Sequence, residues 1–228
     1  MNYLTSDQHF GHSNIIKHCH RLQFMTDAER SVMESGDDNA ISQLRISWES
    51  TARMDKALLD NINSVVGEND TLYHLGDFCW VRGSSEKIAA AYAKYRNQIK
   101  CKNIFLLFGN HDPKHFSKGR EAIKHLFSGT FDNFSLKIGN HHYFLSHYAH
   151  AIWDKRHHGS YHLAGHSHAR AEAWLDSIMP GRFSMDIGVD SAYLLLGEYR
   201  PFSLDEIEAI MSKRPGFGLL KRGEENDT

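Results

Sequence analysis

The chain has 228 residues, which is enough for one domain with a buried core and too few for two domains of average size. Its hydrophobic fraction of 41% and charged fraction of 24% exclude a disordered chain, and no apolar run is long enough to cross a bilayer. A net charge of -2 gives no strong evidence for a nucleic-acid partner, which would favour a basic surface.

Five short apolar runs predict buried strands, and each is followed by polar residues that can take part in chemistry. The runs are residues 3–5, 71–75, 104–108, 143–146 and 161–164. In the same order they lead into Asp7-x-His9, Gly76-Asp77, Gly109-Asn110-His111-Asp112, His147 and Gly165-His166-Ser167-His168. Since ligands of α/β sheets gather at the carboxyl ends of strands, we expect these side chains to meet at one edge.

Helical patterns separate the strands. Apolar residues recur every four positions from Met54 to Val66 and predict an amphipathic helix. Ser85 precedes a good helix-forming stretch and is the expected N-cap there. The run Ser203-Leu204-Asp205-Glu206 has the pattern of a capping box that opens a helix reaching about Met211.

The alternation of strands and helices predicts an α/β layered domain. Gly139-Asn140 separates two strand-like runs and predicts a hairpin, so the sheets are expected to be mixed. We expect a single domain over residues 1–214 and a flexible tail over 215–228. The polar segment 25–48 is interpreted either as a lid over the site or as a solvated insertion.

The cysteines and the N-terminus bear on the compartment. The three cysteines are widely spaced and form no C-x-x-C pattern, so they predict reduced thiols rather than a disulfide frame. The first residues show no basic region followed by an apolar stretch, so no secretory signal is expected. Both observations favour a cytoplasmic protein.

The residues that follow the strands have the composition of a metal site. They supply three carboxylates, one amide and five imidazoles, in a chain that contains 17 histidines. Nitrogen and oxygen ligands without thiolate suit a pair of divalent metals, with manganese first and iron, zinc or nickel as alternatives. Two such metals about 4 Å apart clamp a phosphate and lower the pKa of a shared water.

The five blocks, in this order from Asp7 to His168, resemble the calcineurin-like metallophosphoesterases. The opening run from Ser6 to Ile16 and the later Ile187-Gly188-Val189-Asp190 look like a small bacterial and phage branch of that family. The resemblance implies a four-layer α/β/β/α sandwich with mixed sheets. One departure is Tyr148-Ala149-His150, where the family pattern has proline after the aromatic residue, and this departure affects the local shape of the pocket.

The resemblance also implies a role for each matching position. One metal would be held by Asp7, His9 and His168, the other by Asn110, His147 and His166, and Asp77 would bridge them. His111 would stand beside the substrate and protonate the leaving oxygen, and Asp112 would orient the His111 imidazole. The implied reaction is in-line attack on phosphorus by a metal-bridging hydroxide.

Substrate contacts are less well defined by the sequence. His12 and His150 each lie three residues past a predicted ligand, and Asn14 belongs to the same opening motif as His12, so these are candidate substrate-binding residues. Histidines without motif context are interpreted as surface or core residues, and His162 as structural. Four aromatic residues follow the ligand blocks and serve either core packing or stacking of a base: Phe78, Trp80, Tyr148 and Trp153.

The expected substrate is a small phosphate ester. A nucleotide-type phosphodiester is favoured, because so short a chain has little accessory structure for docking a protein substrate. The alternatives are a phosphomonoesterase acting on a metabolite or phosphoprotein, and a non-catalytic scaffold that binds proteins. A decayed site would lack ligands, whereas every ligand position is filled here.

Overall fold

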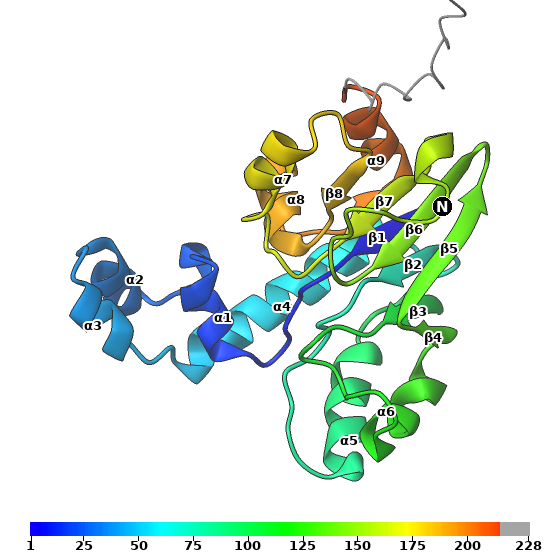
Figure 1. Cartoon of the computed structure of the whole chain (residues 1–228). Coiled ribbons are helices and arrows are strands. Elements are labelled where there is room, and N and C mark those ends of the chain that lie inside the picture. The colour runs from blue at the N-terminus through cyan, green and yellow to red at the C-terminus, as the bar shows by residue number, and fades with distance from the viewer. Residues whose placement is uncertain (215–228) are drawn as a thin grey trace, which may run out of the picture.

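The computed structural model describes residues 1–214, so the predicted tail at 215–228 lies outside the described part of the chain. Two β-sheets pack together with helices on both sides of them (Figure 1). The first sheet has the strand order β4-β3-β2-β1-β9, and the second has the order β5-β6-β7-β8. The fold is therefore an α/β sandwich with two mixed sheets.

Both sheets are mostly parallel with one antiparallel edge strand. In the first sheet β1 to β4 run parallel and β9 is antiparallel to β1. In the second sheet β6, β7 and β8 run parallel, and β5 forms the predicted hairpin with β6. The strand bounds are β1 Asn2–Thr5, β2 Thr71–His74, β3 Asn103–Leu107, β4 Gly129–Phe131, β5 Asn133–Ile138, β6 His141–Ser146, β7 Tyr161–Ala164, β8 Ser184–Asp186 and β9 Phe202–Ser203.

The helices end close to the predicted positions where the sequence signal is strong, although α4 begins at Trp48, ahead of the predicted stripe that starts at Met54. The long amphipathic helix is α4, and the helix with the capping box is α9. The α-helix bounds are α1 Ser13–His18, α2 Asp27–Glu34, α3 Asp38–Gln43, α4 Trp48–Val65, α5 Ser85–Arg96, α6 Lys118–Ile123, α7 Glu172–Ile178, α8 Val189–Leu196 and α9 Leu204–Met211. Short 3-10 turns cover Leu22–Phe24, Lys124–Leu126 and Arg156–His158.

Two apolar clusters hold these layers together. The first lies between the first sheet and helices α4 and α5, where Leu72 and Ile104 pack with Leu58 and Tyr92. The second lies between the sheets, and its members include Leu4 and Tyr73 from the first sheet and Leu145 and Leu163 from the second. Helix α9 adds Leu204, Ile207 and Met211 to the second cluster. Burial of apolar side chains on both faces of the first sheet fixes its strands in register.

The N-caps of α9 and α5 can be compared with the caps that the sequence predicts. At α9 the Ser203 side chain accepts from the Glu206 backbone, and the Glu206 side chain accepts from the Ser203 backbone, so the predicted capping box is confirmed. At α5 the N-cap is Ser84, and the predicted cap Ser85 is the first helical residue. Two adjacent serines offer equivalent hydroxyls, and Ser84 has the extended backbone that a cap requires.

The polar segment 25–48 is largely helical. It holds α2 and α3, which lie at the end of the molecule away from the two sheets (Figure 1). The Glu29 carboxylate fixes the segment, because it accepts hydrogen bonds from the backbone of Thr26 and Ser47 and from the Ser50 hydroxyl. In the described part of the chain, no helix has the length and apolar content needed to cross a bilayer.

Candidate metal centre

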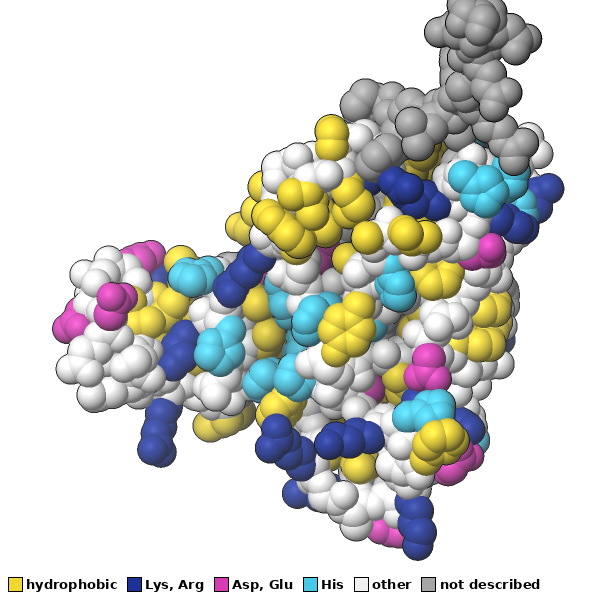
Figure 2. Space-filling model, in the orientation of Figure 1, with side chains coloured by type: hydrophobic (Ala, Val, Ile, Leu, Met, Phe, Trp, Pro, Cys, Tyr) yellow, Lys and Arg dark blue, Asp and Glu magenta, His cyan; other side chains and the backbone are white. Residues whose placement is uncertain are grey.

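The predicted site residues come together where the parallel strands of both sheets end. Past the end of β1, the Asp7 amide donates to the Gly76 carbonyl and the His9 amide donates to the Asp77 carbonyl. The two sheets meet here as well, since the His166 amide donates to Asp7 Oδ2 at 2.9 Å. The residues that directly follow the strands, although far apart in the sequence, therefore form one site, as expected for the carboxyl ends of parallel strands. Figure 2 shows histidine side chains gathered near the middle of one face.

Five of the predicted ligands have a left-handed backbone. Their φ angles are 62° at Asp7, 53° at His9, 56° at Asp77, 69° at His166 and 49° at His168. Residues other than glycine seldom adopt this conformation, and it persists only where the surrounding structure holds it. Its concentration at these five positions makes the strand exits a candidate functional site.

The glycines of the motifs leave room for carboxylates. A Cβ atom at Gly109 would lie 2.2 Å from Asp77 Oδ1, and one at Gly165 would lie 2.5 Å from Asp7 Oδ2. Real Cβ contacts are never this short, so a larger residue at either position would displace the neighbouring carboxylate. The glycine of each block is thus needed because another chain segment approaches closely.

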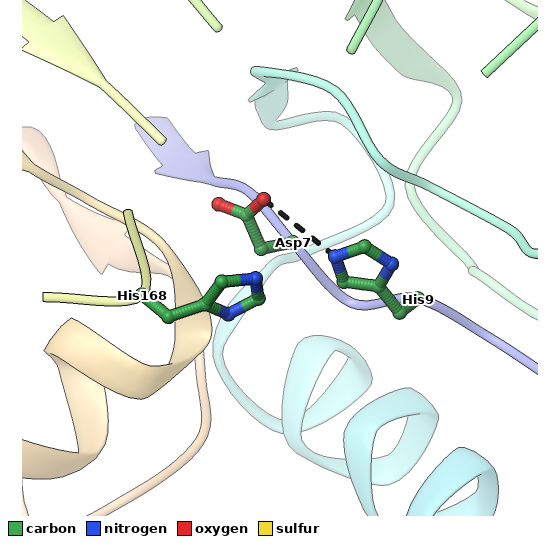
Figure 3. A group of neighbouring side chains, drawn as sticks. All are labelled: Asp7, His9 and His168. Carbon is green, nitrogen blue, oxygen red and sulfur yellow. Dashed lines mark ion pairs between the residues drawn. The ribbon is translucent and has the colours of Figure 1, made fainter. Parts of the chain in front are cut away.

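Asp7, His9 and His168 form the first group of ligand atoms (Figure 3). Asp7 Oδ1 and both ring nitrogens of His9 are buried and have no hydrogen-bond partner. His9 Nε2 lies 3.8 Å from Asp7 Oδ1, which is too far for a hydrogen bond. The Nδ1 atom of His168 is 2.6 Å from Asp190 Oδ2, so Nε2 is the ring nitrogen that can serve as a ligand. Buried polar atoms are nearly always satisfied, so this arrangement fits a bound cation.

Asp77, His147 and His166 form the second group. His147 Nδ1 is bonded to the Leu75 carbonyl at 2.8 Å, and its Nε2 atom lies 2.9 Å from Asn110 Oδ1. This backbone bond fixes the tautomer and presents Nε2 to the interior of the site. The structure therefore places Asn110 beside the same group, as the sequence predicts.

The carboxylate of Asp77 lies between the two groups. Its Oδ2 atom is 3.4 Å from His9 Nε2 and 3.4 Å from His147 Nε2. Its Oδ1 atom accepts the backbone N–H of His111 at 2.8 Å. One carboxylate oxygen thus faces an imidazole of each group, which is the position that a bridging ligand needs.

The electrostatics of the site reflect buried charge. Burial raises the pKa of Asp7 to about 7 and lowers the pKa of His9 well below its usual range. Burial also lowers the pKa of His147, but the hydrogen bond to Asp77 outweighs it and raises the pKa to about 9. Two carboxylates in a desolvated place need compensating positive charge, and divalent cations supply it.

His111 and His12 lie next to the first group. The His111 ring is 5.2 Å from that of His9, and the His12 ring is 5.5 Å from that of His9. Trp80 stacks on His12 with ring centroids 4.0 Å apart and lies 4.8 Å from His111. These three side chains therefore form one border of the site.

Asn14 and His150, the other substrate-binding candidates, lie differently. Asn14 is exposed in α1, two residues past His12. The ring of His150 packs against Phe144 and His162, so its contacts are with the second sheet rather than with the two ligand groups. His162 is buried, and its ring accepts from the His150 backbone, which agrees with a structural role.

The predicted contact between Asp112 and the His111 imidazole is wrong. Asp112 is buried, and its two oxygens accept from the backbone N–H groups of Asp77, Phe78 and Gly109 and from the Tyr92 hydroxyl. None of these four donors is the His111 ring. A carboxylate with four donors holds the Gly76-Asp77 and Gly109-Asn110 loops together, so Asp112 is a positioning residue for the backbone.

The aromatic residues divide between core and site. Phe78 and Trp153 are buried, and Phe78 belongs to the cluster under the first sheet. Tyr148 is half exposed and lies edge-on to the rings of His147 and His166. Trp80 and Tyr148 are thus the aromatic residues of this set that border the site.

Sequence reasoning gave no role to Arg21 and Asp186. Arg21 is fully buried and pairs with Asp190, which bonds His168. Asp186 also contacts the segment around His168, since it accepts hydrogen bonds from the Ser167 hydroxyl and the Ala169 amide. The available signals were local, because Asp186 ends a short strand and Asp190 closes the run Ile187-Gly188-Val189-Asp190 that carries part of the resemblance.

Comparisons with known proteins support the fold. No family model matches the chain. An uncharacterized protein from Methanocaldococcus jannaschii is 25% identical over 211 residues, which cover 92% of this chain and 91% of that protein. The crystal structure of a protein of unknown function from Aquifex aeolicus has a TM-score of 0.57 at 23% identity and covers 92% of this chain and 98% of that chain. The similarity extends over nearly the whole chain and establishes the fold alone, so inference of an activity depends on the site.

Proposed function

We propose that the chain is a dinuclear metal-dependent phosphoesterase of the calcineurin-like type. The observation that carries the proposal is the position of Asp77 Oδ2, which lies 3.4 Å from an imidazole nitrogen of each ligand group. The two mixed sheets with helices on both sides are compatible with the four-layer sandwich of that family.

In this proposal, the residues divide between two cations. Asp7, His9 and His168 would hold one, Asn110, His147 and His166 would hold the other, and Asp77 would be shared. The orphaned Oδ1 atom of Asp7 and the Nε2 atom of His9, which faces Asp77, are the atoms that would gain a partner. Nitrogen and oxygen donors favour manganese, with iron, zinc or nickel as alternatives. When bound, the ions would supply Lewis-acid chemistry and acidify water.

The chain itself supplies the other functions. His111 borders the first group and is held by its own backbone bond to Asp77, so its imidazole is positioned to donate a proton to the leaving oxygen. Asp112 keeps the two loops that carry Asp77 and His111 in place. His12 and Trp80 border the position of the phosphate ester. A phosphodiester is the preferred substrate class, since the chain has little accessory structure for docking a protein.

The test of activity compares bis-p-nitrophenyl phosphate with p-nitrophenyl phosphate. Metal-stripped protein is resupplied with Mn²⁺, Ni²⁺, Zn²⁺ or Mg²⁺, and release of p-nitrophenol is followed. Metal-dependent cleavage of the diester supports the proposal, and cleavage of the monoester alone would make the chain a phosphomonoesterase. Absence of turnover with any metal in a protein that binds two ions would mean either a narrow substrate specificity or a scaffold.

Two variants assign the roles. His111→Ala is expected to lower turnover strongly with metal content unchanged, because in this proposal the residue donates a proton and does not hold a metal; loss of an ion in this variant would instead assign His111 to the group that it forms with His9 and Asp77. His125→Ala is the matched control, since this histidine is exposed in the Lys124–Leu126 turn. Asp77→Ala is expected to remove metal and activity together, and retention of two ions by that variant would refute the shared carboxylate.

A further inference from the structure

Arg21 is buried completely, and its oxygen partners are Asp190 and the backbone carbonyls of Asp7 and Gln8. Its Nη1 atom also contacts Met54 Sδ of α4 at 3.3 Å. Its Nε and Nη2 atoms donate to the two oxygens of Asp190 at 2.9 and 2.8 Å, which is a bidentate pair. The same Nη2 donates to the Asp7 carbonyl at 2.9 Å, and Nη1 donates to the Gln8 carbonyl at 3.3 Å. The guanidinium therefore joins the exit of β1 to the first turn of α8.

Asp190 links Arg21 to His168, the ligand that follows a strand of the second sheet. Its Oδ2 atom accepts from Arg21 and lies 2.6 Å from Nδ1 of His168. With its Nδ1 proton donated to a carboxylate, the His168 ring must present Nε2 as a lone pair. Asp190 thus sets the tautomer and orientation of His168, while Arg21 sets the orientation of Asp190.

We propose that Arg21 and Asp190 are positioning residues that preassemble the first metal site, an inference that rests on the proposed function. Both ends of the pair act on ligands that have a left-handed backbone, with φ of 62° at Asp7 and 49° at His168. Arg21 holds the backbone conformation of Asp7 by donating to its carbonyl. Asp190 holds the orientation of the His168 ring through Nδ1. The second ligand group has no such connection to Arg21, because His147 is oriented by the Leu75 carbonyl.

A role in stability alone does not account for this geometry. Replacing a buried ion pair by apolar residues is often neutral or stabilising, so a buried pair is weak evidence for stability. Here the pair satisfies backbone and ring atoms of two predicted ligands that come from different sheets. Polar partners of ligating histidines commonly affect metal affinity about 10- to 100-fold when they are changed.

The experiment measures Mn²⁺ binding to the metal-stripped full chain by calorimetry, with EPR to distinguish a coupled pair of ions from a single ion. Wild-type protein is expected to bind two ions. In Asp190→Asn the amide donates to His168 Nδ1 or opposes Arg21, so the ring loses its fixed tautomer. One of the two binding steps should weaken about 10- to 100-fold, and the EPR signal of a coupled pair should be lost. Arg21→Lys should weaken the same step, because lysine cannot make the bidentate pair and both carbonyl bonds.

Two further variants separate positioning from folding. Arg21→Gln combined with Asp190→Asn removes both buried charges, so thermal stability should recover relative to Asp190→Asn while the weakened binding step stays weak. Arg200→Lys is the matched control, since Arg200 makes a bidentate pair with Glu206 at α9 and contacts no predicted ligand. Its two binding steps should equal those of the wild type.

The outcomes distinguish this inference from the proposed function. If wild-type protein binds no ion, the proposed function fails. If wild-type protein binds two ions and Asp190→Asn binds both with unchanged affinity, the positioning role is overturned while the metal centre stands. Equal weakening of both binding steps in the double variant would also overturn it, because the loss would then follow general destabilisation.

Discussion

Individual glycines decide whether the ligand carboxylates have room. At Gly165 an added Cβ would lie 2.5 Å from Asp7 Oδ2 and 2.2 Å from the Ser6 hydroxyl. We expect Gly165→Ala to lower the free energy of unfolding by about 1 to 3 kcal/mol, because such overpacking cannot be relieved cheaply. It should also weaken metal binding by moving Asp7. Urea unfolding and calorimetry with Mn²⁺ measure the two effects.

Gly139→Ala is the control for this substitution. Gly139 has φ +56° and no atom within 4 Å of an added Cβ, so the change tests backbone strain without a clash. It should cost about 1 to 2 kcal/mol and leave metal affinity unchanged. Unchanged metal affinity in Gly165→Ala would show that the Asp7 carboxylate does not depend on this glycine.

Asp112 is a second residue whose effect is expected to pass through the backbone. Asn at this position has one accepting atom in place of two, so at least one of the four donors loses its bond. We expect Asp112→Asn to destabilise the fold by about 1 to 3 kcal/mol, and Tyr92→Phe by less, since it removes a single donor. Equal urea midpoints for wild type and Asp112→Asn would contradict this assignment.

Single residues could be predicted from the sequence where the signal lay in their immediate neighbours along the chain. Asp7, His9 and the Gly109-Asn110-His111-Asp112 block follow strands directly, so a local pattern was enough to propose them. The pair of Arg21 and Asp190 joins residues 169 positions apart, and nothing in either neighbourhood indicates the other. The role of Asp112 was missed because two of its four donors are backbone groups of a loop 34 to 35 residues away.

At the scale of elements, the start of α9 carries a pH-dependent contribution to stability. The hydrogen bond to Arg200, together with bonds from the Ser203 backbone and side chain, lowers the pKa of Glu206 to about 2. The unfolded pKa is about 4.3. A carboxyl group with a lowered folded pKa stabilises the fold above the unfolded pKa, and this contribution is lost as the pH falls from there through about 2.

Glu206→Gln tests this contribution. The variant should be less stable than wild type at pH 6, and the difference in urea midpoint should shrink between pH 5 and 3 as the glutamate of the unfolded wild type takes up a proton. The difference between the two proteins removes the effects of other carboxyl groups. A constant difference over that range would show that the Glu206 carboxylate does not contribute through its charge.

Elements with strong local signals were predicted, and short ones were not. The stripe of α4 and the capping box of α9 are repeated patterns, so they could be recognised without the fold. Strands β4, β8 and β9 have only two or three residues and exist because neighbouring strands pair with them. Likewise α2 and α3 lie in a polar segment whose helical structure depends on caps at Thr26 and Asp37.

For the whole molecule, the metal centre is expected to act as a connection between the two sheets. Asp7, His9 and Asp77 follow strands of the first sheet, whereas His147, His166 and His168 follow strands of the second. A cation bound by both sets stabilises the sandwich by an amount that grows with the logarithm of one plus the ratio of metal concentration to Kd, and this amount is about 2.7 kcal/mol at a concentration 100 times Kd. Metal removal should therefore lower the melting temperature, at about 2 to 4 °C per kcal/mol for a domain of this size.

Thermal unfolding with and without Mn²⁺ measures this connection. Wild-type protein should melt several degrees higher with the metal, and the increase should grow with metal concentration. In Asp77→Ala the increase should disappear, because the carboxylate shared by the two ligand groups is gone, whereas His111→Ala should keep it. An equal metal-dependent increase in Asp77→Ala would mean that the stabilising ion binds elsewhere and that the metal centre does not connect the two sheets.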